Sequence, residues 1–211
     1  MKYFTFIIIL FIGIGLLGGI NSKINPFVAK VKTEQIKPYT DKQIDSVKTR
    51  AIKGNFNSEM AVFVNFGKFS GQDRFYLVDL ETKKVILSGL CCHGGGYGFD
   101  QEEVVFSNEA GSHCSSEGFY KIGYPYTGIF GKAYKLYGLS STNTNAFDRF
   151  VVLHSHDCVP EKEVTSSICE SQGCPTLSPE VFLKLSKYLD ASKKPILMWI
   201  YKGPADKKPS P

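Results

Sequence analysis

Two residues twenty positions apart, His154 and Cys174, carry side chains that together could transfer an acyl group. A thiol with an imidazole within reach is the minimal activated cysteine nucleophile, because the imidazole can take the thiol proton and leave a thiolate. Ser171, Gln172 and Gly173 directly precede the cysteine, and a glycine there lets the backbone approach a bound carbonyl closely. We expect the N–H groups of Gly173 and Cys174 to point at a developing oxyanion. This pattern predicts a cysteine acyl-transfer site.

His154 ends a short apolar run, residues 150–153, whose composition is typical of a buried strand. A side chain at the end of a strand can leave the sheet and face a cleft. Strand alternation places His154 and His156 on one face, so either imidazole could approach the thiol. The two histidines next to Cys158, with His93 elsewhere, also permit a zinc site, although regular metal-ligand spacing is otherwise absent.

Two further segments could line a substrate cleft. Residues 92–96 (Cys-His-Gly-Gly-Gly) are not a phosphate-binding loop, because no Lys-Ser/Thr pair and no evident helix follow them. They are either a flexible turn or a cleft wall that brings His93 near the thiol. Arg149 precedes the histidine strand, where its guanidinium could bind a substrate carboxylate in a bidentate pair. A surface or structural salt bridge explains Arg149 equally well.

Several motifs together resemble one enzyme family. His154-Ser155 and the later Ser171-Gln172-Gly173-Cys174 resemble the signature of the L,D-transpeptidase (YkuD-like) catalytic domain, in which a histidine and a spacer precede Ser/Thr-x-Gly-Cys. Other blocks resemble the murein branch of that family, and the resemblance extends over residues 61–201. These blocks are residues 92–96, 106–108, 115–120, 128–131, 136–139 and 145–149.

The resemblance implies a mainly β fold, a β-sandwich or barrel-like sheet with a few peripheral helices, and no cofactor. It implies that Cys174 is the nucleophile and His154 the general base. The Ser155 carbonyl is then expected to orient the imidazole, with His156 in a supporting position. The implied partners are peptidoglycan stem peptides, whose L,D-peptide bond opens through a Cys174 thioester. An amine acceptor gives a cross-link, whereas water gives L,D-carboxypeptidase activity.

The chain departs from the murein branch at Glu170, where an arginine is expected before the Ser-x-Gly-Cys motif. An acidic group beside the thiolate is expected to raise the thiol pKa and weaken the nucleophile. A second hypothesis is therefore a peptidoglycan-binding envelope protein that retains the scaffold without the chemistry. Its distinguishing feature would be Cys174 in a disulfide. A secreted zinc hydrolase is a third hypothesis.

The elements that must position these residues are mostly short strands. Residues 81–83 are expected to connect a hairpin, and no internal repeat is evident. Many short strands separated by turn signals, with few helices, predict a mainly β sandwich or barrel-like sheet. Strand patterns lie at residues 60–66, 74–80, 84–87, 118–122, 133–137, 150–153 and 196–201.

Two helices are expected around this sheet. Thr40 or Asp41 caps the first helix, over residues 41–53. Ser178 caps the second helix, and Pro179 occupies its first position. The expected inward side chains are Ile44, Val47 and Ile52 in the first helix and Val181, Phe182, Leu185, Tyr188 and Leu189 in the second.

The chain of 211 residues divides into four expected regions. Residues 1–22 are a signal peptide or an N-terminal membrane anchor, because one lysine precedes an uncharged, mostly apolar stretch over residues 3–20. Residues 23–58 are a linker with a short helix, residues 59–202 the catalytic domain, and residues 203–211 a disordered tail. These features predict an exported protein of the periplasm or cell envelope, with inner-membrane tethering through residues 3–20 left open.

Composition narrows the partners further. The net charge of +5 comes with scattered lysines rather than a dense basic run, so nucleic acid is not expected as a partner. Six cysteines in an exported chain raise the question of disulfides. If Cys174 stays a thiol, the other five cannot all pair. We predict a bond between Cys158 and Cys169, within the segment that connects the two catalytic residues.

Overall fold

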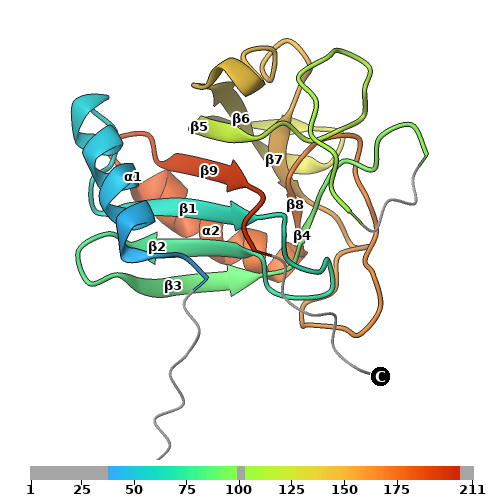
Figure 1. The fold of residues 1–211 in the computed structure, drawn as a ribbon, viewed down its shortest axis with the longest axis horizontal. Coiled ribbons are helices and arrows are strands. Elements are labelled where there is room, and N and C mark those ends of the chain that lie inside the picture. Colours follow the sequence, from blue (N-terminus) through green and yellow to red (C-terminus); the bar gives the residue numbers. More distant parts are fainter. Residues whose placement is uncertain (1–37, 99–102, 205–211) are drawn as a thin grey trace, which may run out of the picture. The chain divides into compact units, whose positions relative to one another are not determined.

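The computed structural model describes residues 38–98 and 103–204, and the mainly β fold expected from the sequence is confirmed (Figure 1). The described elements are α1 (Asp41–Lys53), β1 (Met60–Asn65), β2 (Phe75–Asp79), β3 (Lys84–Gly89), β4 (Cys91–Cys92), β5 (Gly118–Gly128), β6 (Gly131–Gly138), the 3-10 helix η1 (Ser141–Asn143), β7 (Val152–Ser155), β8 (Thr176–Leu177), α2 (Pro179–Ala191) and β9 (Leu197–Tyr201).

The nine described strands form one sheet in the order β3-β2-β1-β9-β5-β6-β7-β8-β4. Its two outermost strands, β3 and β4, are separated in the chain by Leu90 alone. The sheet must therefore curl until its edges lie near each other, which makes it barrel-like. Strands β1 and β9 pair in parallel, as do β7 and β8, and the remaining neighbours are antiparallel.

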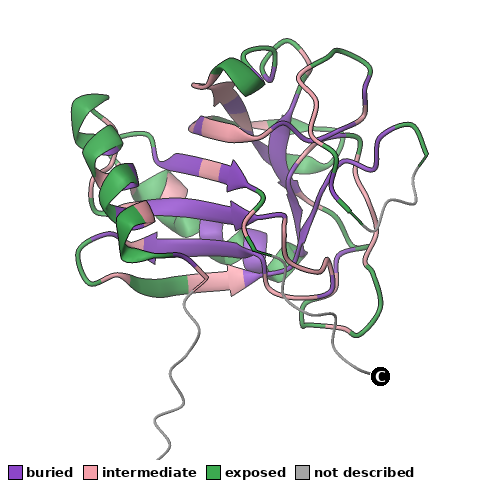
Figure 2. Ribbon diagram, in the orientation of Figure 1, coloured by how far each residue is buried: buried purple, intermediate pink, exposed green. Residues whose placement is uncertain are grey.

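Strand β1 is buried on both faces because each helix covers one of them (Figure 2). Val62 and Val64 belong to the larger apolar cluster, which includes Leu185 of α2. Phe63 belongs to a second cluster, with Ile44 of α1. This packing explains why residues 60–64 form a continuous apolar run instead of alternating with polar residues.

Both helices begin where the sequence places them. Thr40 and Gln43 form a reciprocal capping box at α1, and the Ser178 hydroxyl accepts from the Val181 N–H at α2. Two expected inward side chains are exposed instead: Ile52 in α1, which is 63% exposed, and Tyr188 in α2. In α1 the buried position next to Ile52 is occupied by Ala51.

The structure differs from the strand predictions in three ways. Strands β5 and β6 are longer than expected and meet in a tight hairpin, with Gly128 opposite Gly131. Strand β7 starts at Val152 rather than at 150, because Phe150 has a φ of 57° and ends the preceding turn. The two-residue strands β4 and β8 were not predicted, since so short a ladder has no periodicity to detect.

The predicted disulfide between Cys158 and Cys169 is confirmed, with a Cα–Cα distance of 6.1 Å. The loop that it closes is also held to the turn before β2. The Val164 N–H donates to the Gly71 carbonyl over 2.8 Å, and Glu163 Oε1 accepts from the Asp73 N–H over 2.9 Å. The segment between the candidate base and nucleophile is thus tied down at several points.

The predicted signal or anchor at residues 1–22 lies outside the described residues, as does most of the predicted tail, from residue 205 onward. Within residues 38–98 and 103–204, neither α1 nor α2 is long and apolar enough to span a bilayer. Helix α1, expected in a linker region, packs into the apolar cluster around Phe63. The four region boundaries remain predictions.

Candidate active site

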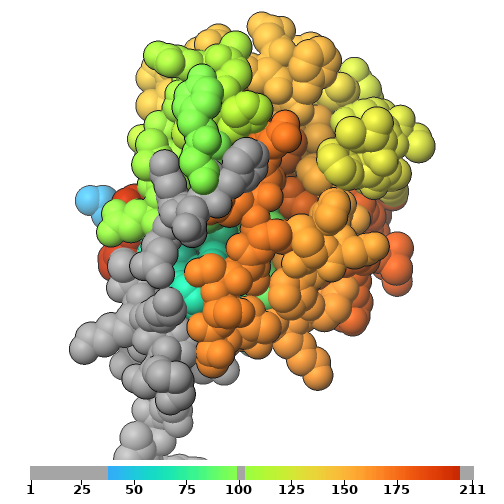
Figure 3. Space-filling view, turned by 90° about the vertical axis from the view of Figure 1, so that its right-hand side faces the viewer, coloured from blue at the N-terminus to red at the C-terminus, as the bar shows by residue number. Residues whose placement is uncertain are grey.

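The pairing of β7 with β8 brings the two candidate catalytic residues to one pocket. His154 on β7 is in register with Thr176 on β8, and Cys174 lies in the turn directly before β8. The Val152 N–H donates to Cys174 Sγ over 3.4 Å. Cys174 and His154 both line a pocket of about 500 Å³. Figure 3 shows this side of the molecule, where the yellow β5–β6 hairpin lies beside the orange segment around residues 150–175.

His154 is held by both ring nitrogens. Its Nδ1–H donates to the Ser155 carbonyl over 3.0 Å, which is the orienting contact expected for Ser155. This leaves Nε2 as the basic nitrogen, and it lies 3.1 Å from the Thr176 hydroxyl. Burial lowers the imidazole pKa below its ordinary value of 6.5. The hydrogen bond to the Ser155 carbonyl raises this pKa by less, and His156 lowers it slightly further. His154 is therefore neutral at neutral pH, as a general base must be.

Cys174 is a free, partly exposed thiol. Burial of its sulfur raises the thiol pKa above its ordinary value of 9.0, and the Val152 N–H and the Arg149 guanidinium lower it by less. Glu170 is not among the groups that shift it, so the expected effect of that acidic neighbour is absent. The resting pair is thus a thiol and a neutral imidazole, and the thiolate must form by proton transfer to the base during reaction.

This resting state predicts the pH dependence of alkylation. Because burial disfavours the thiolate, its population is small at neutral pH and keeps growing past pH 9. The rate at which iodoacetamide labels Cys174, followed on its peptide by mass spectrometry from pH 6 to 10, is expected to rise over the whole range. A plateau reached near pH 7 would instead indicate a stable thiolate–imidazolium pair.

Thr176 is a site residue that the sequence analysis missed. Its hydroxyl lies 3.1 Å from His154 Nε2 and 3.2 Å from the Cys174 carbonyl. With the proton of the neutral ring on Nδ1, the hydroxyl donates to Nε2. Once the ring is protonated, Nε2–H can donate to the hydroxyl, which can then turn to the carbonyl. Thr176 therefore positions the base in both of its protonation states.

For the reaction rate, the hydroxyl group at position 176 should matter more than the size of the side chain. We expect Thr176→Val to lower kcat about tenfold, with little change in KM, because the imidazole loses an orienting bond. Thr176→Ser should restore most of the rate. Equal rates for the Val and Ser variants in steady-state assays would contradict a positioning role.

The turn before Cys174 depends on Gly173, whose φ is 115°, a region that L side chains rarely adopt. Ser171 fixes this turn: its hydroxyl donates to the Cys174 carbonyl over 2.7 Å and accepts from the Gly173 N–H over 3.2 Å. The expectation that the Gly173 N–H is open to an oxyanion is thus wrong for this state. The Cys174 N–H makes no hydrogen bond to another described residue, so it is the available donor. Gln172 is exposed and lines the pocket.

The glycine-rich segment 92–96 is a buried support rather than a flexible turn. Two backbone hydrogen bonds join this segment to Ser171. The Ser171 N–H donates to the His93 carbonyl over 2.8 Å, and the Gly95 N–H donates to the Ser171 carbonyl over 3.0 Å. A Cβ on Gly94 would lie 2.6 Å from Cα of Gly173, so only glycine allows this close contact. Within the segment, Cys92 lines the pocket.

His93 does not face the thiol, so the alternative that placed its side chain near Cys174 is not observed. It is buried behind the pocket, where the fully buried Arg74 donates from Nη2 to its Nδ1 over 2.8 Å. Its Nε2 lies 3.8 Å from Glu170 Oε1. The glutamate that departs from the family pattern is therefore directed at a buried histidine and arginine, which explains why it leaves the thiol unaffected.

The Arg149 guanidinium forms hydrogen bonds within the protein instead of presenting its charge to a substrate. Nη1 donates to the Ser107 carbonyl and the Ser116 hydroxyl over 2.8 and 3.3 Å. Nη2 donates to the Ser112 hydroxyl and the Cys114 carbonyl over 3.2 and 2.7 Å. Both terminal nitrogens are thus occupied by carbonyl and hydroxyl acceptors, so among the described residues neither of the two interpretations of Arg149, a clamp on a substrate carboxylate or a salt bridge, is observed. The guanidinium still lines the pocket and favours the thiolate.

Aromatic residues around the histidines were also missed by the sequence analysis. Phe130, at the tip of the β5–β6 hairpin, stacks on His154 with ring centroids 4.4 Å apart and meets His156 edge-on at 5.9 Å. His156 is exposed, and its Nδ1 accepts from the Cys158 N–H, so it contributes to the pocket without an observed contact to the thiol. Exposed Ile129 and Phe150 complete an apolar rim.

The zinc hypothesis required the histidines and Cys158 to converge. Among the described residues, one group of three potential metal ligands has its ligand atoms within 4.8 Å of one another: Cys92, Cys158 and Cys169. No histidine belongs to it, and a disulfide joins two of its sulfur atoms. The predicted arrangement of His93, His154 and His156 with Cys158 is therefore not assembled.

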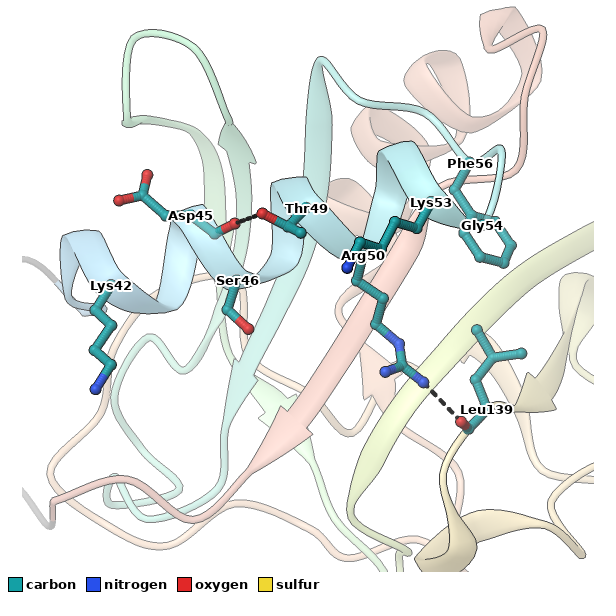
Figure 4. Close-up of a pocket in the computed structure, with 9 residues that line it drawn as sticks. All are labelled: Lys42, Asp45, Ser46, Thr49, Arg50, Lys53, Gly54, Phe56 and Leu139. Atoms are coloured by element: carbon teal, nitrogen blue, oxygen red, sulfur yellow. Dashed lines mark hydrogen bonds between the residues drawn. The ribbon is translucent and has the colours of Figure 1, made fainter.

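A second pocket, of about 760 Å³, lies along α1 (Figure 4). Its lining is basic, with Lys42, Arg50 and Lys53, and Arg50 reaches across it to donate to the Leu139 carbonyl over 2.9 Å. Neither a cysteine nor a histidine lines this pocket. It therefore lacks the cysteine and histidine pair, and the pocket around Cys174, which has both, is the candidate active site.

Comparison with known proteins assigns a family to this arrangement. The L,D-transpeptidase catalytic domain matches residues 31–201, most of the chain. No curated protein matches.

Solved structures resemble the chain distantly. The Ldtfm–avibactam carbamoyl enzyme is 12% identical over 69% of this chain and 49% of its own, with a TM-score of 0.41. The helical cell shape determining protein Pgp2 from Campylobacter jejuni is 12% identical over 80% and 58%, with a TM-score of 0.45. An L,D-transpeptidase from Mycobacterium smegmatis is 11% identical over 68% and 58%, with a TM-score of 0.38. The chain thus spans only about half of these proteins.

Proposed function

The chain belongs to the L,D-transpeptidase catalytic domain family, and on that premise we propose that it is a cysteine acyltransferase that acts on peptidoglycan stem peptides. One observation carries the proposal. Cys174 is a free, partly exposed thiol in the same pocket as His154, whose Nδ1 is fixed by the Ser155 carbonyl. A nucleophile, a base and an orienting group are the three parts that such chemistry requires.

The reaction begins with the neutral pair. Nε2 of His154 leaves the Thr176 hydroxyl and takes the Cys174 proton as a stem peptide binds. The thiolate attacks the carbonyl on the L-side of an L,D-peptide bond, and the Cys174 N–H stabilises the oxyanion. The Gly173 N–H could become a second donor to the oxyanion only after its hydrogen bond to the Ser171 hydroxyl is broken. The imidazolium then protonates the departing D-residue, which leaves a thioester on Cys174.

The acceptor decides the product. An amine from a second stem peptide attacks the thioester and gives a cross-link, with the proton returning to His154. Water in the same position gives an L,D-carboxypeptidase.

The second hypothesis, a binding protein without chemistry, rested on Cys174 being locked in a disulfide and on an unfavourable Glu170. The described disulfide uses Cys158 and Cys169 instead, and Glu170 faces His93. These contacts support the catalytic proposal. The proposed location is the periplasm or cell envelope, because residues 1–22 have the pattern of an export signal or anchor and the substrate is found there.

The test uses the full-length chain in detergent and a disaccharide tetrapeptide with a terminal L,D-bond. Liquid chromatography with mass spectrometry should show release of the terminal D-residue together with a cross-linked dimer or a tripeptide. A tetrapeptide of the same composition with an L,L-bond serves as the control and should stay intact. An unchanged L,D-substrate in the presence of folded protein would contradict the proposal.

A further inference from the structure

A third sulfur atom lies against the disulfide beside the candidate active site. The free thiol of Cys92 lies 3.2 Å from Sγ of Cys169, which is bonded to Cys158. All three sulfur atoms lie within 4.8 Å of one another, so Cys92 is in reach of both halves of the bond. A thiol this close to a disulfide is placed for thiol–disulfide exchange, which needs no external oxidant.

We propose that Cys92, Cys158 and Cys169 form a thiol–disulfide exchange centre with two disulfide states. The Cys92 thiolate attacks Sγ of Cys169, and a Cys92–Cys169 bond forms as the Cys158–Cys169 bond breaks. Cys158 leaves as a thiolate and takes up a proton equivalent to the one that Cys92 lost. One disulfide and one thiol are present before and after, so no net oxidation or reduction occurs.

The two states would differ at the candidate active site. Cys92 belongs to β4 and is in register with Thr176, the residue that holds His154. Cys158 is exposed, lines the same pocket as Cys174 and donates its backbone N–H to His156. In the second state, Cys169 is tied to the buried strand β4, while Cys158 presents a reactive thiol on the pocket wall. That thiol is the point at which small disulfides or a redox partner could react.

Exchange should be slow at neutral pH. Burial raises the pKa of Cys92 to about 12, with the Glu170 carboxylate acting in the same direction and the Arg74 guanidinium opposing both. Cys91, next to Cys92, is also buried and has a raised pKa. Because only the thiolate attacks, the exchange rate should increase about tenfold for each pH unit below that pKa.

The experiment maps disulfides in the full-length wild-type chain. Samples held at pH 7.5, 8.5 and 9.5 are quenched with acid, and unpaired thiols are labelled before digestion and mass spectrometry. The expected result is a linked Cys92–Cys169 peptide pair and labelled Cys158, both accumulating faster at higher pH. Cys92→Ala should show neither. Cys91→Ala, which removes the neighbouring buried thiol, should behave like wild type.

Cys158→Ala provides the reference for the second state. With oxidised glutathione as the oxidant, its Cys92 and Cys169 should join almost completely, which identifies the linked peptides. Failure to find the Cys92–Cys169 pair, either in this variant or in wild type at pH 9.5, would overturn the proposal. Because the readout is a peptide mass, the result is independent of whether the chain proves to be an acyltransferase.

Discussion

Cys174→Ala should reduce release of the terminal D-residue from an L,D-tetrapeptide by at least about 1,000-fold, because the other free thiol that lines the pocket, Cys92, is buried and burial raises its pKa to about 12. The structure supports this expectation: Cys174 is the free thiol in the turn before β8, held by the Val152 N–H. The measurement is kcat/KM from product quantified by mass spectrometry. Circular dichroism of the variant establishes that it remains folded.

The matched control is Cys114→Ala. Cys114 is also a free cysteine near the pocket, but it contributes through its backbone carbonyl, which accepts from Arg149. Removing its sulfur should leave the rate close to that of the parent. If Cys174→Ala retained turnover comparable to that of Cys114→Ala, the assignment of the nucleophile would be wrong.

His154→Ala should lower the rate of thioester formation about 100- to 10,000-fold at pH 7, the range expected for loss of a general base. The effect should be large because burial keeps the Cys174 pKa high, so that little thiolate forms without a base. The loss should shrink as the pH rises, since hydroxide then takes over the deprotonation. Pre-steady-state acylation kinetics from pH 7 to 10 measure both effects.

His156→Ala is the comparison that separates the two histidines. His156 lines the same pocket and contacts the same Phe130 ring, but it is exposed and its Nδ1 bonds the Cys158 N–H. Its removal should change the rate by less than about tenfold, because it takes part in no proton transfer. If His154→Ala and His156→Ala lowered the rate equally, the assignment of His154 rather than His156 as the general base would be contradicted.

Local chemistry made the helices and several strands predictable. The Thr40 and Ser178 caps and Pro179 are recognised from adjacent residues, and both helices start there. The orienting carbonyl of Ser155 was predictable for the same reason, since it follows its histidine in the chain. The Cys158–Cys169 bond was also predicted, although its closeness to Cys92 was not.

Contacts between distant segments could not be read from the sequence. Arg149 looked available to a substrate, but its acceptors are provided by a loop more than thirty residues earlier. His93 seemed near the thiol because of its glycines, yet Arg74 binds it behind the pocket. Thr176 and Phe130 became site residues only when β6, β7 and β8 were aligned in the sheet.

The central claim is that Cys174 is an activated nucleophile, and covalent trapping tests it most directly. Carbapenems imitate the acyl donor and acylate reactive thiolates, so intact mass spectrometry of the full-length chain after incubation with one should show a single adduct. Peptide mapping should place that adduct on Cys174, and Cys174→Ala should not form it. No adduct while Cys174 is free and the protein folded, or an adduct that persists in Cys174→Ala, would contradict the claim.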